Sequence, residues 1–340
     1  MLDATVTLYT IGSCGFYSDE GRVFGGPKGT FLDLKEWAKT LETIGESATY
    51  TPSEDDPTLR CFCIDIRKLD KQDCYLIATW NELARIEDGV QLLAVASHIG
   101  DAQVSSVKVD TMSLPGYPAY FFVDAGLKQA INFRFEQRLN GSSQFQRLVA
   151  GFLKSYSKWC SWDPHDPDQL IGYSASKEDP VVDVEPLFST KLFRRGYQVD
   201  FIKENVGNIR RVVKRASVNP TIEAHKTFLD SSFEILGLPI NNRLTAEIPF
   251  QYQFKTKLTP AKFDSIVSSY ETDPDHPWDD VGFVFARDSG KVHWLSGCIA
   301  RQKWQIDVAR TESGMVDVDE LVDYINENVD KIKKALVKGK

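Results

Sequence analysis

Two short segments of the chain carry the residue types that bind divalent metals. Their acidic and imidazole side chains are Asp163, His165, Asp166 and Asp168 in the first segment, and Asp273, Asp275, His276, Asp279 and Asp280 in the second. Carboxylates and imidazoles at this density could hold Mg²⁺ or Mn²⁺ and support phosphodiester cleavage. Proline interrupts both segments, and aspartates in such turns usually accept hydrogen bonds from nearby backbone amides. The sequence therefore favours two surface turns, and a metal-dependent nuclease remains an alternative.

Other catalytic motifs are not evident. The run GGPKGT at 25–30 has lysine and glycine in the wrong order for a phosphate-binding P-loop, and no G-x-G-x-x-G follows a strand. There is no G-x-S-x-G elbow and no H-E-x-x-H pair among the five histidines. The six cysteines are scattered, and Cys61 and Cys63 are too close together for a zinc ligand pair. We expect reduced core cysteines, no enzyme activity, no bound metal and no cofactor.

Basic residues are concentrated between positions 191 and 215. They are Lys191, Arg194, Arg195, Lys203, Arg210, Arg211, Lys214 and Arg215, and only Asp200 and Glu204 oppose them. The segment has a net charge of +6, and because the whole chain carries −8, the remainder carries −14. Concentrated positive charge binds a polyanion because each neutralised phosphate releases condensed counterions. The alternative is a solvated strand face that acidic neighbours balance.

Further basic residues extend this candidate surface. Lys255 and Lys257 belong to a neighbouring predicted strand, and Arg287 and Lys291 flank the turn of a late hairpin. Phe193, Tyr197 and Phe201 interleave with the basic residues, but a spacing of four places them on one face of a strand, which favours a core position.

The elements of the first half read as a mixed α/β unit. Alternating residues predict a strand at 6–11, a glycine-rich loop follows at 12–29, and Thr30 is expected to cap a helix. Two hairpins are predicted at 61–67 with 74–80, and at 119–123 with 130–135. A helix begins at Ser142. Residues 158–180 are rich in Pro, Asp and Ser, which is typical of a linker.

The second half is predicted to contain more strands before its last helix. Strands are expected at 198–203, 208–213, 246–250 and 253–258, with a hairpin at 281–287 and 291–294. Helices are expected at 220–236, after Thr259-Pro260, and from Asp317 to about Leu336, where Asp317 and Glu320 form a capping box. The fold class is α+β: two α/β domains with mostly antiparallel sheets and flanking helices, at 1–157 and 181–340, joined by an acidic linker at 158–180.

Composition places the chain among globular proteins, with 42% hydrophobic and 26% charged residues. No run of about 18 apolar residues is present, and the first residues lack the features of a signal peptide. We therefore expect a cytoplasmic protein.

One stretch of the chain is close to a known family. Residues 113–124, SLPGYPAYFFVD, resemble the S-L-G-F-P-S-F-L-F-V strand of the RexA phage exclusion proteins of lambdoid prophages. A glycine turn, a second strand that includes NFRF at 132–135, a polar loop and an apolar helix follow in the same order. The segment DVEPL at 183–187 resembles the I-E-P-L opening of the family's second part. The later strands, the late hairpin and the closing amphipathic helix also keep the family's order.

The resemblance implies a homodimer that binds double-stranded DNA without sequence preference and acts in prophage-encoded exclusion of other phages. It also implies a membrane-protein partner, and a fold similar to that of the recombination-associated RdgC proteins, which encircle duplex DNA. On matching strands it assigns DNA binding to Lys255, Lys257, Arg287 and Lys291. Charge clustering alone nominates Arg194, Arg195, Arg210, Arg211, Lys214 and Arg215. The chain differs from the family in its greater length, its acidic linker and its acidic balance. A protein-interaction component of phage defence, without DNA binding, is the alternative.

Overall fold

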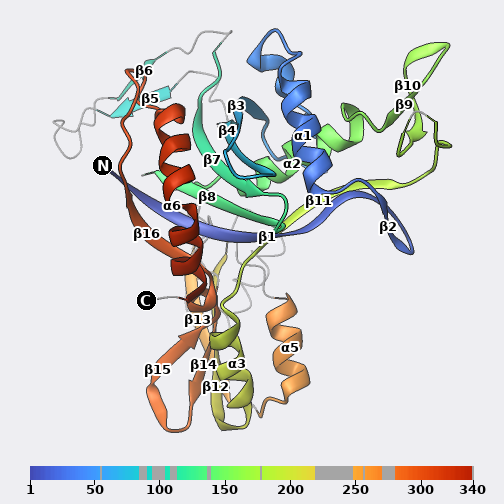
Figure 1. Cartoon of the computed structure of the whole chain (residues 1–340). Helices are drawn as coiled ribbons and strands as arrows, with labels where there is room; N and C mark the ends of the chain where they lie inside the picture. The colour runs from blue at the N-terminus through green and yellow to red at the C-terminus, as the bar shows by residue number, and fades with distance from the viewer. Residues whose placement is uncertain are drawn as a thin grey trace. The chain divides into compact units, whose positions relative to one another are not determined.

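The computed structural model describes residues 1–338 except 54–55, 84–89, 94–103, 108–112, 136–138, 177, 219–247, 256 and 270–279. The chain forms two compact units. Unit 1 contains Met1–Lys191 and Arg301–Leu336, and unit 2 contains Leu192–Ala300 (Figure 1). The expected fold class, α+β with mostly antiparallel sheets, is confirmed. The helix expected at 220–236 and the strand residues 246–247 lie outside the described residues.

Unit 1 is built on an eight-stranded sheet with the order β11-β1-β8-β7-β4-β3, and β16 and β2 also pair with β1. Its strands are β1 (Leu2–Ser18), β2 (Gly21–Phe24), β3 (Cys61–Lys68), β4 (Cys74–Glu82), β7 (Gly116–Asp124), β8 (Gln129–Phe135), β11 (Glu185–Leu192) and β16 (Arg301–Ile306). Both hairpins expected here, β3–β4 and β7–β8, are present with antiparallel register. A separate pair is formed by β5 (Val90–Leu93) and β6 (Val104–Val107).

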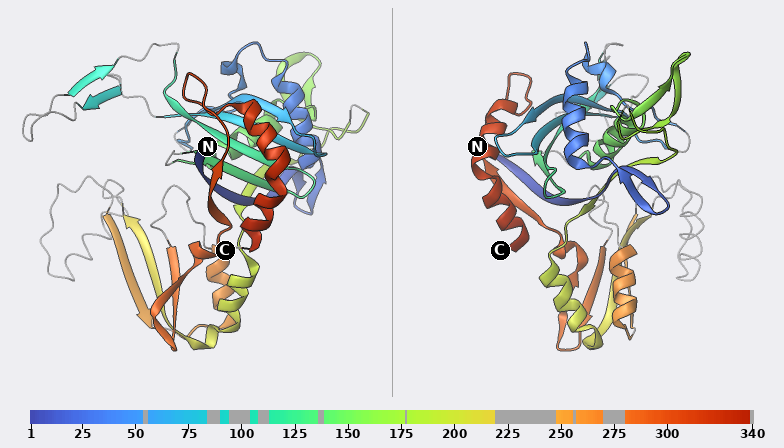
Figure 2. Two further views of the ribbon diagram at one scale, coloured as in Figure 1. Left: turned by 60° about the vertical axis from the view of Figure 1, so that its left-hand side comes forward. Right: turned by 45° about the vertical axis from the view of Figure 1, so that its right-hand side comes forward.

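Helices cover both faces of this sheet. Figure 2 shows α1 (Pro27–Ala38) and α2 (Ser142–Ser155) on one face and α6 (Val318–Lys338) on the other. Because successive strand residues point to opposite faces, Phe121 of β7 stacks on Phe145 of α2 at 4.2 Å between ring centroids, whereas Phe122 lies beneath Lys333 of α6. The double cover explains why β7 is apolar at consecutive positions and does not alternate.

The glycine-rich segment after the first strand is more regular than the sequence suggested. β1 continues to Ser18 and forms a hairpin with β2, so the loop expected at 12–29 is wrong. Helix α1 begins at Pro27, with the proline in its first turn, and not at Thr30. Thr30 is buried inside the helix, where its hydroxyl accepts a hydrogen bond from the Cys14 thiol.

The proposed linker at 158–180 is part of unit 1. It contains an antiparallel pair, β9 (Cys160–Asp163) and β10 (Asp166–Tyr173). Trp159 and Tyr173, both less than 8% exposed, pack against Phe16 of β1. These two buried aromatic side chains attach the segment to the main sheet. The linker prediction missed this packing because it rested on the Pro- and Asp-rich composition.

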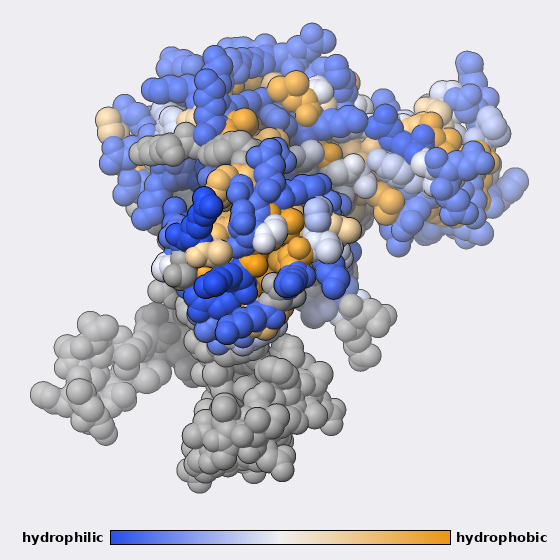
Figure 3. Space-filling view, turned by 90° about the horizontal axis from the view of Figure 1, so that it is seen from below, coloured by the Kyte–Doolittle hydropathy of each residue, from blue (hydrophilic) through white to orange (hydrophobic). Residues whose placement is uncertain are grey.

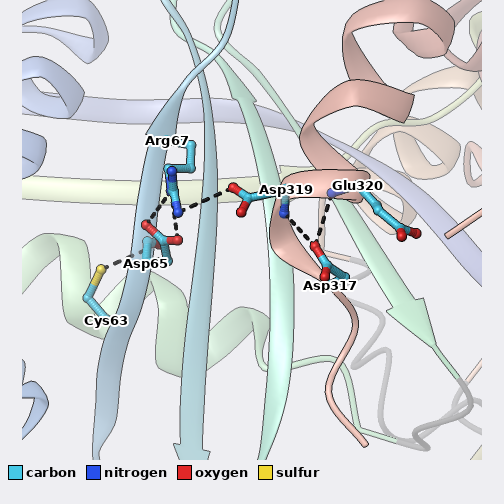
Figure 4. A network of polar contacts seen from close by, with 6 residues as sticks. All are labelled: Cys63, Asp65, Arg67, Asp317, Asp319 and Glu320. Carbon is cyan, nitrogen blue, oxygen red and sulfur yellow. Dashed lines mark hydrogen bonds and ion pairs between the residues drawn. The ribbon is translucent and has the colours of Figure 1, made fainter. Parts of the chain in front are cut away.

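The C-terminal helix also belongs to unit 1, and not to the second domain as the sequence suggested. Its buried stripe of Leu321, Ile325, Val329 and Ile332 covers the second face of the large sheet. The N-terminal cap at Asp317 is confirmed, because its carboxylate accepts hydrogen bonds from the backbone amides of Asp319 and Glu320 (Figure 4). The capping box itself is wrong: the Glu320 carboxylate accepts from the Ala309 amide.

Unit 2 is a four-stranded sheet with the order β13-β12-β14-β15. The strands are β12 (Ile209–Val218), β13 (Ile248–Lys255), β14 (Asp280–Phe285) and β15 (Asp288–Trp294), accompanied by α3 (Gly196–Glu204) and α5 (Pro260–Ser269). The core joins Ile202 of α3 and Phe263 of α5 to Val212 and Phe283 of the sheet. The helix that begins at Pro260 is confirmed.

Residues 198–203 were expected to form a strand, and they lie in helix α3. Val199 and Ile202 lie three residues apart on one face of the helix and pack on the unit 2 core, and Val206 joins them from the turn that follows α3. Phe201 points away from that face and is 49% exposed, so the core position expected for it is also wrong.

All six cysteines are free thiols and five of them are buried, which confirms the expectation of reduced core cysteines. Among the described residues, no helix has the length and apolar character needed to cross a bilayer.

Candidate nucleic-acid interface

The topology of unit 2 gathers several of the predicted basic residues at one end of its sheet. β12 begins where β13 and β14 end, because Arg211 pairs with Lys255 and Ile209 pairs with Phe285. Arg287 lies in the turn between β14 and β15. The residues brought to this end are Arg210, Arg211, Lys255, Lys257 and Arg287, with Lys291 further along β15. Figure 3 looks onto this end, where hydrophilic side chains surround a smaller apolar group.

The two faces of β12 divide the basic residues. Val212 packs into the core against the helices, so Arg211, Val213 and Arg215 occupy the opposite face. Lys214 shares the face of Val212, and it pairs with Tyr252 on β13. The four basic residues of β12 therefore do not form a single surface.

A hollow of about 390 Å³ lies at the basic end, lined by Arg210, Arg211, Lys255 and Val284. The register between β12 and β14 shifts between Ile209 and Arg211, so Arg210 is the extra residue of a β-bulge. The bulge lets two successive arginines line one hollow, although neighbours on a regular strand point apart. Another hollow, of about 250 Å³, lies in unit 1, and its lining includes Lys39, Glu42 and Asp65. The charged residues that line the hollow in unit 2 are all basic, whereas those that line this hollow in unit 1 include both signs.

Neutral neighbours orient the arginines on the Arg211 face. The Arg211 guanidinium donates to the side-chain oxygen of Gln253 at 3.1 Å, and Arg215 donates to that of Gln251 at 3.0 Å. The Arg215 guanidinium also lies 3.9 Å from the ring centroid of Trp294, a cation–π contact. These contacts orient the two guanidinium groups through neutral partners.

Acidic residues are missing from the two strands at the centre of the site. β12 and β13 together hold five basic residues and no acidic one. Within the described parts of the chain, none of six basic residues forms an ion pair: Arg210, Lys214, Lys255, Lys257, Arg287 and Lys291. Within β12 and β13 themselves, no acidic side chain balances this positive charge.

Arg194 and Arg195 have structural roles inside unit 2. The Arg194 guanidinium donates at 3.0 Å to the carbonyl oxygen of Val267, in the last turn of α5. Arg195 precedes the first residue of α3, and its backbone amide donates to the Cys298 carbonyl oxygen at 2.7 Å. Proximity in sequence placed these arginines with the basic cluster; the structure uses the Arg194 side chain to fasten α5, whereas the hydrogen bond at Arg195 involves its backbone alone.

Sequence reasoning missed an aromatic pair on β13. Tyr252 and Phe254 are 47% and 46% exposed, and their ring centroids are 6.3 Å apart. The sequence QYQFK at 251–255 alternates amides with aromatics and ends in lysine. In a strand, this alternation puts both rings on one face. Apolar rings in a strand usually indicate core, so the pattern alone did not single them out.

The first acidic segment that suggested a metal site surrounds the turn between β9 and β10, and the one described residue of the second, Asp280, begins β14. Asp163 accepts a hydrogen bond from the His165 amide at 2.7 Å, and Asp166 accepts one from the Asp168 amide at 3.2 Å. Asp280 is buried and bonded to the amide and hydroxyl of Ser296. Asp273, Asp275, His276 and Asp279 lie outside the described residues. Among those described, no group of three or more His, Cys, Asp or Glu residues is arranged to hold a metal ion.

No protein-family model matches the chain, and neither the curated proteins nor the solved structures include one with significant similarity to it.

Proposed function

We propose that the protein binds double-stranded DNA without sequence preference through the basic end of unit 2. The observation that carries this proposal is the absence of acidic residues from β12 and β13, two paired strands with five basic residues. Such a surface keeps its positive potential even though the chain as a whole carries −8.

The binding is electrostatic. Arg210, Arg211 and Lys255 line one hollow and can contact neighbouring phosphate oxygens together. Guanidinium groups suit this task because their planar donors match two phosphate oxygens at once. Contacts to phosphates fix position on the duplex but carry no sequence information. Non-specific binding follows from this set of contacts.

Dimerisation and a role in phage exclusion with a membrane-protein partner are proposed on the RexA resemblance alone. A dimer would present two basic ends to one duplex, and linked sites raise the overall affinity without new contacts. Light scattering on the purified chain gives the mass that tests dimerisation, and a monomer mass at micromolar concentration contradicts it.

A mobility-shift titration tests DNA binding. We expect a duplex of about 25 base pairs to bind at 50 mM salt and to lose affinity by roughly 10²-fold or more at 200 mM, because several phosphate contacts release counterions. The double variant Arg210→Glu/Arg211→Glu is expected to abolish the shift.

The matched control is Lys68→Glu/Lys154→Glu, which makes the same change in net charge on exposed residues of unit 1. It is expected to leave binding nearly unchanged. Salt-independent binding, or equal losses in both double variants, contradicts the proposal and favours the interaction-component alternative.

A further inference from the structure

Strand β13 is exposed along its second half. All five side chains from Gln251 to Lys255 are exposed, on both faces of the strand. β13 is the first strand in the order of the sheet, with β12 as its described neighbour. A ligand that follows this strand can therefore contact side chains of either face.

The aromatic side chains on this strand form a stacked pair. The rings of Tyr252 and Phe254 are inclined by only 24° to one another, and nearly half of each side chain is accessible. Elsewhere in unit 2, Phe263 and Phe283 are fully buried, whereas Phe201 of α3 is 49% exposed. Exposing two adjacent rings costs hydrophobic free energy, which binding a flat apolar surface recovers.

The charge around the pair identifies the kind of flat surface. Lys214 lies beside Tyr252 on the same face of the sheet, and Lys255 and Lys257 follow at the end of the strand. Neither β12 nor β13 has an acidic residue. Nucleobases joined by phosphates combine flat faces with regularly spaced negative charge, whereas an apolar protein segment offers no partner for the lysines.

We propose that β13 binds single-stranded DNA, with bases stacked on Tyr252 and Phe254 and phosphates contacted by Lys214, Lys255 and Lys257. This inference rests on the proposed DNA binding and adds a preference for unpaired strands. A duplex hides the faces of its bases within the helix, so only an unpaired strand can use the aromatic pair. Stacking on aromatic side chains is tolerant of sequence, because every base has a π-face.

Fluorescence anisotropy with a labelled oligothymidine of about 12 nucleotides and a labelled duplex tests the inference. The double variant Tyr252→Ala/Phe254→Ala is expected to lose at least about tenfold in affinity for the single strand, since each stacked base contributes about 1–3 kcal/mol. Its affinity for the duplex is expected to stay within about twofold. Tyr252→Trp/Phe254→Trp is expected to retain single-strand binding, because the rings remain.

The matched control is Tyr156→Ala/Trp162→Ala, which removes two exposed aromatic side chains from unit 1. It is expected to change neither affinity. Ultraviolet crosslinking of the unmodified protein to DNA containing 5-iodouracil gives a readout that needs no variant, and crosslinks are expected at Tyr252 or Phe254.

The outcomes separate this inference from the proposed function. Duplex binding with steep salt dependence, together with unchanged single-strand affinity in the aromatic double variant, overturns the single-strand inference alone. Equal losses for both ligands, or crosslinks confined to other residues, overturn it as well. Failure of the duplex to bind the unmodified protein overturns the proposed function, and failure of the single strand to bind overturns the single-strand inference.

Discussion

The basic side chains of units 1 and 2 differ in the partners that they contact. In unit 1, Arg60 forms a two-point ion pair with Glu82, Arg67 contacts Asp65 and Asp319, and Lys71 contacts Asp330. In unit 2, Arg211 at the basic end of the sheet contacts Gln253, and Arg215 further along β12 contacts Gln251 and Trp294. Described carboxylates of unit 1 therefore pair with basic side chains of its fold, whereas β12 and β13 of unit 2 contain no acidic residue.

The apolar residues follow the same division. The large sheet of unit 1 is covered on both faces, and its aromatic residues Phe121 and Phe122 are buried at consecutive positions. β13 in unit 2 leaves Tyr252 and Phe254 half exposed. Aromatic residues thus fill the core in unit 1, whereas on β13 they are partly exposed and, in our proposal, serve recognition.

The largest difference between the units is expected for aromatic truncation. Phe122→Ala should lower the free energy of unfolding by about 3–5 kcal/mol, because it leaves a cavity under α6. Phe254→Ala should change it by less than about 1 kcal/mol, because nearly half of the ring is already in water. Urea denaturation of both variants measures these values. Equal destabilisation would show that the β13 ring is a core residue and would remove the contrast.

Smaller changes in stability are expected for Arg194 and Arg210, two arginines that charge clustering placed in the same candidate surface. Arg194→Met removes the hydrogen bond to the Val267 carbonyl and should lower the free energy of unfolding by about 1–3 kcal/mol, with DNA affinity kept. Arg210→Met removes an exposed charge, so stability should change by about 0.5 kcal/mol or less. The slope of log affinity against log salt concentration should become shallower by about 1, because one phosphate contact is lost.

Thermal denaturation and the salt titration, run on both arginine variants, separate these two roles. If Arg194→Met weakens DNA binding without loss of stability, its assignment to helix anchoring is wrong.

The smallest effect concerns the buried thiols. Burial raises the pKa of Cys14 in unit 1 and of Cys298 in unit 2 to about 11, and that of Cys63 to about 12. The folded state therefore holds these protons more tightly than the unfolded chain, whose thiols have a pKa near 9. This stabilisation is complete below pH 9 and is lost as the pH rises through about 11. Unit 1 should lose more of it, because it contains five of the six thiols.

Labelling with a thiol reagent at pH 8 tests the burial directly. Cys160, the one thiol that is partly exposed, should react first, and the others only as the units unfold. Rapid labelling of Cys63 or Cys298 in the native protein would contradict the assignment.

Local patterns predicted local structure well. The β3–β4 and β7–β8 hairpins and the helices that begin at Ser142 and Pro260 follow from alternation, turn residues and caps close in sequence. Residues 198–203 were misassigned because Val199 and Ile202 fit a short strand as well as a helix face. Only packing against Phe263 and Phe283 decides between the two.

The candidate site was predicted in part. Arg210 and Arg211 were identified by charge clustering and Lys255 through the RexA resemblance, and the structure brings the three around one hollow. The structural use of Arg194 depends on a carbonyl 73 residues away, and the separation of Lys214 from Arg211 depends on which face meets the helices. Neither relation is visible in a run of sequence.

The order of the units along the chain has a consequence for synthesis. Unit 2 is inserted between β11 and β16, and both of those strands pair with β1 of unit 1. On a ribosome, unit 2 is complete before β16 and α6 emerge to close the large sheet. Until then, one apolar face of the unit 1 sheet stays uncovered in the nascent chain, and chaperones recognise exposed apolar surface of this kind. The DNA-binding candidate region would thus be folded first, on a scaffold that is finished last.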